Sequence, residues 1–197
     1  MKRLAYFCLL MLIATSACGL AVAQGKPTAL PNRPGALVSS LYEQVVARHP
    51  LGVPYGADMD IFAPYLSKAL LHRFDLNNAC FADWRRQYPD PNLKPIIGMF
   101  EDGVFSGEDE KAEPRDFHIE RIEPGKDGAS RVYVRFAWGS PAEKPWTWYV
   151  AAVVVRENGR VAVDDVLYLK NKEGDIESRL SERLSSRCNG ARYSGGY

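Results

Sequence analysis

The stretch WTWYVAAVVVRENGRVAVDDVLYLK, residues 146–170, decides the fold. Two apolar runs flank Asn158-Gly159, a dipeptide typical of a β-hairpin turn of type I′, in which both central residues need a positive φ. The sequence therefore predicts strands at about Trp146–Arg156 and Arg160–Lys170. The first strand is apolar on both faces, which is typical of a strand in the middle of a sheet with both sides covered.

Upstream of this hairpin, alternation of polar and apolar residues predicts two more strands, whereas the N-terminal half has the spacing of amphipathic helices. The expected strands are Phe117–Glu123 and Arg131–Trp138, with a short one at Ile96–Phe100; the expected helices are Pro34–His49, Ile61–Phe74, Ala79–Gln87 and Ile176–Arg187. Helices followed by an antiparallel meander indicate the α+β class. We expect N-terminal helices packed on a curved antiparallel sheet of four to five strands, a cone-like space between them, and a C-terminal helix.

The N-terminus has the pattern of a secretory signal. Met1-Lys2-Arg3 precedes a mostly apolar run, and Ala21-Val22-Ala23 fits a cleavage site after Ala23. The sequence therefore predicts a periplasmic or secreted protein; an uncleaved membrane anchor and a lipoprotein acylated at Cys18 are the alternatives. The expected divisions are a signal peptide at 1–23, a flexible leader at 24–33, a single domain at 34–190 and a disordered tail at 191–197.

The charge of the exported chain indicates which classes of partner to expect. The signal carries two of the 25 basic residues and none of the 24 acidic ones, which leaves a net charge of −1. A nearly neutral chain gives no reason to expect nucleic acid as a partner, or a membrane beyond the signal segment. The acidic residues at 101–113 (Glu101, Asp102, Glu108, Asp109, Glu110 and Glu113) lack the frame of a calcium loop and are expected to form a solvated charge run.

Cleavage would leave two cysteines, Cys80 and Cys188. Two cysteines in an exported chain most often pair, and this disulfide would close a loop of about 109 residues. The alternative is a pair of buried thiols. Neither cysteine has a neighbour at metal-ligand spacing, so no metal and no cofactor is expected.

Four motifs carry a family resemblance: YLSKALLH at Tyr65–His72, DPNLKP at Asp90–Pro95, FSG at Phe105–Gly107 and VDDVLYLK at Val163–Lys170. With its order of helices and meander, the chain resembles the nuclear-transport-factor-two-like (cystatin-like cone) superfamily, and within it a group of bacterial exported or lipoprotein-type domains of unknown function. The resemblance implies a cone-like fold. That superfamily holds isomerases, dehydratases, ligand carriers and interaction modules, so fold does not decide function.

Asp165 is the residue with the most suggestive position. Strict alternation places it on one face with Val161, Val163, Leu167 and Leu169, where a lone carboxylate is costly without a partner. We expect that partner to be Arg73, His49 or His72. Asp165 is then either a general acid or base of a small isomerase- or dehydratase-like enzyme, acting with His49 or His72, or a structural group that forms an ion pair or accepts backbone hydrogen bonds.

The helices and strands also offer candidate binding residues: Arg73, Tyr65 and Trp148 toward the cone, and Tyr133 and Arg135 on an open sheet face through which a homodimer would form. The first hypothesis is a non-enzymatic module of the bacterial cell envelope that binds a protein partner or a small ligand. The alternatives are the enzyme just described and an immunity-type inhibitor of a secreted toxin.

Overall fold

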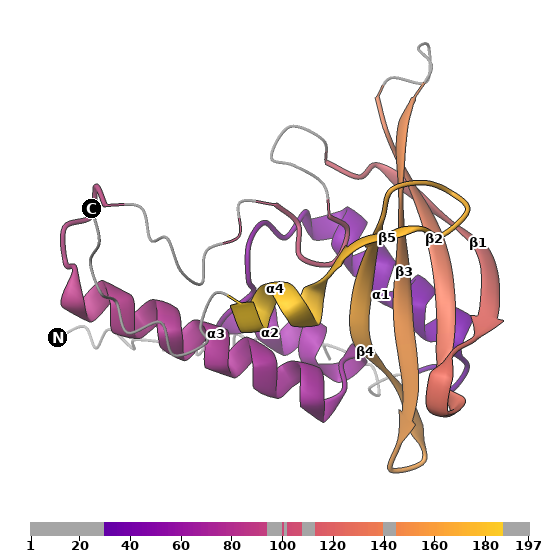
Figure 1. Cartoon of the computed structure of the whole chain (residues 1–197), viewed down its shortest axis with the longest axis horizontal. Helices are drawn as coiled ribbons and strands as arrows, with labels where there is room; N and C mark the ends of the chain where they lie inside the picture. Colours follow the sequence, from indigo (N-terminus) through magenta and orange to yellow (C-terminus); the bar gives the residue numbers. More distant parts are fainter. Residues whose placement is uncertain (1–29, 94–99, 101, 108–112, 140–144, 187–197) are drawn as a thin grey trace, which may run out of the picture.

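The computed structural model shows an α+β arrangement in which helices cover one face of an antiparallel sheet (Figure 1). The structure describes residues 30–93, 100, 102–107, 113–139 and 145–186. The sheet has five strands in the order β1-β2-β3-β4-β5, so each strand pairs with its neighbours in the chain. The predicted fold class is confirmed. Within the described ranges, every helix is too short or too polar to cross a membrane.

The strands follow the period-two pattern of the sequence. Their bounds are β1 Asp116–Pro124, β2 Ser130–Trp138, β3 Trp146–Glu157, β4 Arg160–Leu169 and β5 Ile176–Arg179. Between β3 and β4, Asn158 and Gly159 have φ values of 51° and 79°, as a type I′ turn requires. β3 is the central strand, as predicted.

The helices agree with the sequence only in part. They are α1 Pro34–Arg48, α2 Ala57–Phe62, the short 3-10 helix η1 Ala63–Tyr65, α3 Lys68–Gln87 and α4 Leu180–Ser186. α1 is close to its expected span and packs on β1, β2 and β4. The predicted helices Ile61–Phe74 and Ala79–Gln87 are helical over most of their length, but their bounds are wrong: the chain leaves the helix at Leu66–Ser67, and α3 then continues without a break to Gln87.

Leu66 and Ser67 are extended because they pair with the sheet. Leu66 forms a parallel bridge with Val163, and the Ser67 N–H donates to the Val163 carbonyl at 2.8 Å. Ser67 then caps α3, since its Oγ accepts the Leu70 N–H at 2.9 Å. The break therefore serves two elements at once: it ends η1 against the edge of β4 and starts α3.

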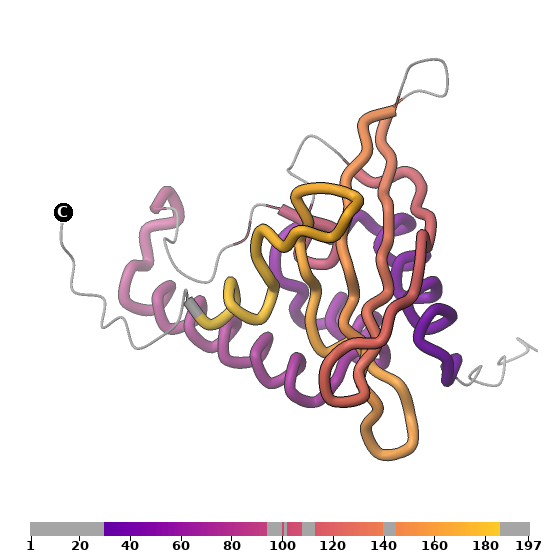
Figure 2. The backbone as a smooth tube through the Cα atoms, turned by 45° about the vertical axis from the view of Figure 1, so that its right-hand side comes forward, coloured from indigo at the N-terminus to yellow at the C-terminus, as the bar shows by residue number. Residues whose placement is uncertain are grey.

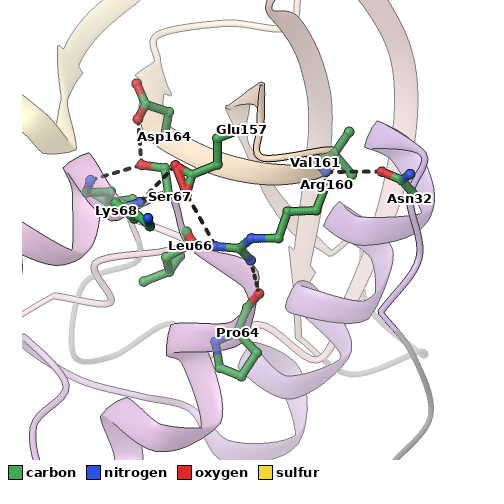
Figure 3. A network of polar contacts seen from close by, with 10 residues as sticks. Asn32, Pro64, Leu66, Ser67, Lys68, Glu157, Arg160, Val161 and Asp164 are labelled. Carbon is green, nitrogen blue, oxygen red and sulfur yellow. Dashed lines mark hydrogen bonds and ion pairs between the residues drawn. The ribbon is translucent and has the colours of Figure 1, made fainter.

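The two charged residues that flank the Asn-Gly turn hold this break in place (Figure 3). The Arg160 guanidinium donates to the carbonyls of Pro64 at 2.7 Å and Leu66 at 2.9 Å. The Glu157 carboxylate accepts the Lys68 N–H at 3.2 Å. Backbone groups that a continuous helix would have satisfied internally are thus satisfied by the β3–β4 hairpin.

The predicted helix Ile176–Arg187 is wrong over its first turn. Residues Ile176–Arg179 form β5 and pair with β4, in register at Leu167↔Arg179. The preceding turn is closed by the Asn171 side chain, which accepts the N–H groups of Gly174 and Asp175. Pairing with the edge of β4 satisfies backbone donors and acceptors of both strands, which explains why these residues are extended.

The space between helices and sheet is filled by segment 102–107 of the chain. Three side-chain donors bond three successive carbonyls of this segment: Tyr168 to Val104 at 2.8 Å, Tyr42 to Phe105 at 3.1 Å and Trp148 to Ser106 at 2.8 Å. The Phe105 ring lies 4.8 Å from the ring of Phe62 and 5.9 Å from that of Phe74. Aromatic side chains of the chain itself therefore lie in the cone-like space expected from the sequence.

Asp102, which the sequence placed in a solvated acidic run, is instead part of the packing between segment 102–107 and α4. Asp102 forms an ion pair with Arg183 of α4 at 2.6 Å, and the Arg183 guanidinium lies 4.8 Å and 4.9 Å from the ring centroids of Phe100 and Tyr168. Burial raises the pKa of the Tyr168 hydroxyl well above its usual value. Glu113 is exposed, as expected; the other acidic residues, and most of the predicted strand Ile96–Phe100, lie outside the described residues.

Candidate functional site

A β-bulge in β4 changes the face on which Asp165 lies. Val154 of β3 pairs with Val163, but Val153 pairs with Asp165, so Asp164 is an extra residue in the ladder. Alternation counted through this point is out of phase by one residue. Val163 and Val166 belong to the main core, whereas Asp165 lies on the opposite face, among the partners of β3 that point away from the helices. The predicted placement of Asp165 with Val161 and Val163 is therefore wrong.

Asp165 is fully engaged by hydrogen bonds. It is 7% exposed. Its Oδ1 accepts the N–H groups of Val166 and Ser181, both at 2.9 Å, and its Oδ2 accepts the Ser181 hydroxyl at 2.7 Å. Since Ser181 is in the first turn of α4, the carboxylate fixes the start of that helix. This arrangement corresponds to the structural alternative, in which Asp165 accepts backbone hydrogen bonds.

The three expected partners of Asp165 lie elsewhere. His49 is the C-cap of α1 in a left-handed conformation, and its Nδ1 is buried without a hydrogen-bond partner among the described residues. His72 and Arg73 are exposed on α3 rather than turned toward the core. Arg73 donates to the Ser185 hydroxyl at 3.0 Å, which ties α3 to α4. The structure does not bring these residues together into one site.

The other sequence candidates are structural in their contacts. Tyr65 is half-buried against the main core. The Trp148 indole stacks on Phe136, with ring centroids 5.5 Å apart, and donates to the Ser106 carbonyl. Cys80 lies on α3, but Cys188 lies outside the described residues, so their disulfide stays a prediction.

The sheet face away from the helices is partly covered, contrary to the expectation that Tyr133 and Arg135 form an open surface. The Arg121 guanidinium lies 3.6 Å from the centroid of the Tyr133 ring, and a Cβ added at Gly174 would come within 3.0 Å of that ring. The loop that follows β4 thus folds over this end of the sheet, where Figures 1 and 2 show it crossing the strands. Arg135 is paired with Glu120 at 2.7 Å.

Next to this covered end, the same face holds a pocket of about 310 Å³. Its floor is apolar and consists of Val153, Val155 and Leu167. The turn between β1 and β2, residues 125–129, forms one wall and folds across the strands (Figure 2). Asp127 in this turn has a left-handed backbone with φ of 55°, which bends the turn sharply. We call this site the outer pocket.

Charged side chains of both signs line the outer pocket: Lys126, Arg131 and Arg179, and Asp127, Asp164 and Asp165. Pairing across the strands explains how they meet. Arg131, Val153 and Asp165 occupy one row across β2, β3 and β4, and Leu167 pairs with Arg179 in the next row. Paired residues project to the same face of a sheet, so the row presents a cation, an apolar group and an acid side by side.

Some charged side chains of the outer pocket already form hydrogen bonds or ion pairs within the protein, and others do not. Asp164 Oδ1 accepts the Ser67 hydroxyl at 2.5 Å, and Arg179 lies 3.5 Å from Glu182. Glu123 stands opposite Arg131 in the β1–β2 ladder. Its pKa is below its usual value because Arg121 and, to a lesser extent, Tyr133 donate hydrogen bonds to it, and the nearby charge of Arg131 adds a smaller contribution. Among the described residues, Arg131 itself makes no hydrogen bond or ion pair.

Sequence reasoning placed Arg131 on a strand but did not select Arg131, Lys126 or Arg179 as site residues. Alternation does put Arg131 opposite the core-facing Val132, which is a usable signal. The register that brings Val153 beneath it, and the bulge that adds Asp164 and Asp165, could not be read from either strand alone.

Comparison with known proteins adds little to this geometry. No family model matches the chain. A search of curated proteins finds no match either. One solved structure is similar: a protein of unknown function from Bacteroides thetaiotaomicron VPI-5482, with a TM-score of 0.31 and 14% identity, covering 67% of this chain and 86% of that one. A likeness of this size carries no argument, and the resemblance to the cone superfamily stays a prediction.

Proposed function

We propose that this protein is an exported, non-enzymatic binding module of the bacterial cell envelope, and that the outer pocket is its ligand site. The observation that carries the proposal is the pocket itself: an apolar floor within a ring of charged side chains of both signs. Binding sites typically combine an apolar surface with a few polar groups that orient the ligand.

The positions of the remaining candidates favour binding over catalysis. The enzyme hypothesis needed Asp165 in the cone with His49 or His72. Asp165 instead lies on the other side of the sheet, where Ser181 and Val166 occupy its oxygens. Phe105 is fully buried between the helices and the sheet, in the region where the enzyme hypothesis placed its substrate.

Native mass spectrometry of the protein released from the envelope tests the proposal. Wild type should carry a non-covalent small molecule. Val155→Phe fills the floor of the outer pocket and should abolish that extra mass. Thr147→Phe is the matched control, because Thr147 lies on the same strand and the same face but outside the pocket lining. An adduct that survives in Val155→Phe, or one lost equally in Thr147→Phe, would contradict the site.

The export part of the proposal has its own test, because residues 1–29 lie outside the described part of the chain. N-terminal sequencing of the exported protein should begin at Gln24. A different first residue would refute the cleavage site, and recovery only as a full-length chain in the membrane fraction would favour the uncleaved anchor.

A further inference from the structure

We propose that the ligand of the outer pocket is a small zwitterion with an apolar group, of the chemical class of an amino acid or a short peptide. This inference rests on the proposed function, since it names the ligand class of the same pocket. Size is the first argument. A volume of about 310 Å³ lies at the lower end of the range of about 300–1,000 Å³ that ligand pockets span. The pocket therefore suits a small molecule rather than a folded partner.

The second argument is the separation of charge across the pocket floor. Lys126 and Arg131 stand on the side of the β1–β2 turn, where Asp127 is exposed, and Asp164 and Asp165 stand on β4, on the other side of Val153. Arg179 lies beyond them on β5 and is paired with Glu182. Adjacent strands lie about 4.8 Å apart, so the backbones of Arg131 and Asp165 are separated by about 10 Å. Side chains that reach inward from both sides leave a gap that suits a ligand with one charge at each end.

The third argument is which groups are still able to bind. Arg131 has no hydrogen bond or ion pair among the described residues, so its guanidinium can take a carboxylate, for which its geometry is well suited. Asp164 uses one oxygen for Ser67, and its other oxygen makes no hydrogen bond within the described part of the chain. Asp165 is already saturated by Ser181 and Val166. We therefore assign the ligand carboxylate to Arg131 and the ligand ammonium to Asp164.

Ligands with a single charge fit this arrangement less well. An anion bound at Arg131 would leave Asp164 without a cationic partner, and a cation bound at Asp164 would leave Arg131 without an anionic one. An uncharged apolar molecule would remove water from the charged side chains of both walls without offering them a hydrogen bond or an ion pair. The carboxylate of a zwitterion can pair with Arg131 and its ammonium with Asp164. Its apolar side group can then lie on Val153, Val155 and Leu167.

A titration of the full-length protein with L-leucyl-L-leucine tests the ligand class, followed by the backbone amide NMR shifts of Val153, Val155 and Leu167. The free dipeptide should shift these amides. Acetylating its N-terminus or amidating its C-terminus should each weaken binding about tenfold or more, since each removes a charged hydrogen-bonding end. The doubly blocked peptide should bind most weakly.

Two variants assign the ends of the ligand. Arg131→Gln should weaken the free dipeptide and make the protein insensitive to amidation, while leaving the effect of acetylation intact. Asp164→Asn should do the reverse, and its amide oxygen can still accept from Ser67. Arg156→Gln is the control, because Arg156 is exposed on β3 and does not line the pocket. Thermal melting of each variant verifies that it is folded.

The outcomes separate this inference from the proposed function. A doubly blocked peptide that shifts the same amides as strongly as the free one would overturn the zwitterion and leave the pocket as an apolar ligand site. Failure of every peptide to shift these amides would also overturn it, and the mass-spectrometric comparison of Val155→Phe with Thr147→Phe would then decide whether the pocket binds another molecule.

Discussion

The two faces of the sheet are built from the same strands but differ in what their apolar residues do. On the helix side, Val150, Ala152 and Val154 of β3 join the main core. On the other side, Ala151 joins a small second cluster, and Val153 and Val155 form the floor of the outer pocket. An apolar strand therefore does not reveal by itself which face packs and which face binds. The elements that cover each face decide this: helices and segment 102–107 on one, a tight turn and a loop on the other.

The largest effect should come from the helix-side face. Phe105→Ala removes a fully buried ring from between Phe62 and Phe74. Truncations of this kind cost about 3–5 kcal/mol of unfolding free energy, because transfer energy is lost and a cavity remains. Urea unfolding followed by circular dichroism measures the loss. The matched outer-face variant, Val155→Ala, should cost about 1 kcal/mol or less, because Val155 is only half-buried.

Equal losses from these two variants would end the distinction between a packed face and a binding face. A sharper form of the test adds benzene to Phe105→Ala. A dry apolar cavity binds such a molecule, so the variant should regain stability while wild type should not change.

The next largest effect should separate the two adjacent aspartates of the bulge. Asp165→Ala deprives the half-buried Ser181 of acceptors for both its N–H and its hydroxyl, and should cost about 2–3 kcal/mol. For a domain of this size that lowers Tm by about 4–12 °C. Asp164→Ala removes one bond, to Ser67, from a half-buried position and should cost about 1 kcal/mol. Differential scanning calorimetry of the two variants measures both changes.

The opposite order of stability losses for these two variants would contradict the assigned roles. If Asp164→Ala were the more damaging variant, Asp165 would not be the group that fixes α4. Retained stability in Asp165→Ala, together with loss of a measured activity, would return the enzyme hypothesis to consideration.

Local patterns predicted the elements whose causes are local. The turn at Asn158-Gly159 depends on the φ preferences of its own two residues, and α1 depends on the spacing of Leu37, Leu41 and Val45 along one helix face. Both were predicted close to their observed bounds. The type of fold followed from the order of such elements.

The errors arose where a distant residue supplied the cause. The break at Leu66–Ser67 depends on Val163 and on Arg160, about a hundred residues away. β5 formed because β4 had an edge to pair with. The bulge at Asp164 reversed the face of Asp165, and with it the expected site. The outer pocket depends on such long-range pairings throughout, so sequence patterns could indicate that Arg131 projects away from the core but not what it meets.

The smallest effect should come from the rim of the outer face, at Glu123, which accepts a hydrogen bond from Arg121 at 2.7 Å. The pKa of Glu123 is lowered chiefly by this bond, so its stabilising effect is present above the unfolded-state pKa of about 4.3 and is lost as the pH falls through the lower folded-state value. Both side chains are well exposed, at 34% and 45%, so solvent and salt screen the interaction. Glu123→Gln should therefore be slightly less stable than wild type at pH 7, and the difference in urea unfolding should shrink as the pH falls below the unfolded-state pKa and as salt is added. An NMR titration in which Glu123 ionises at or above its usual pKa would mean that Arg121 does not hold this carboxylate. Glu123 would then be free to pair with Arg131, and the cation assigned to the ligand would already be occupied.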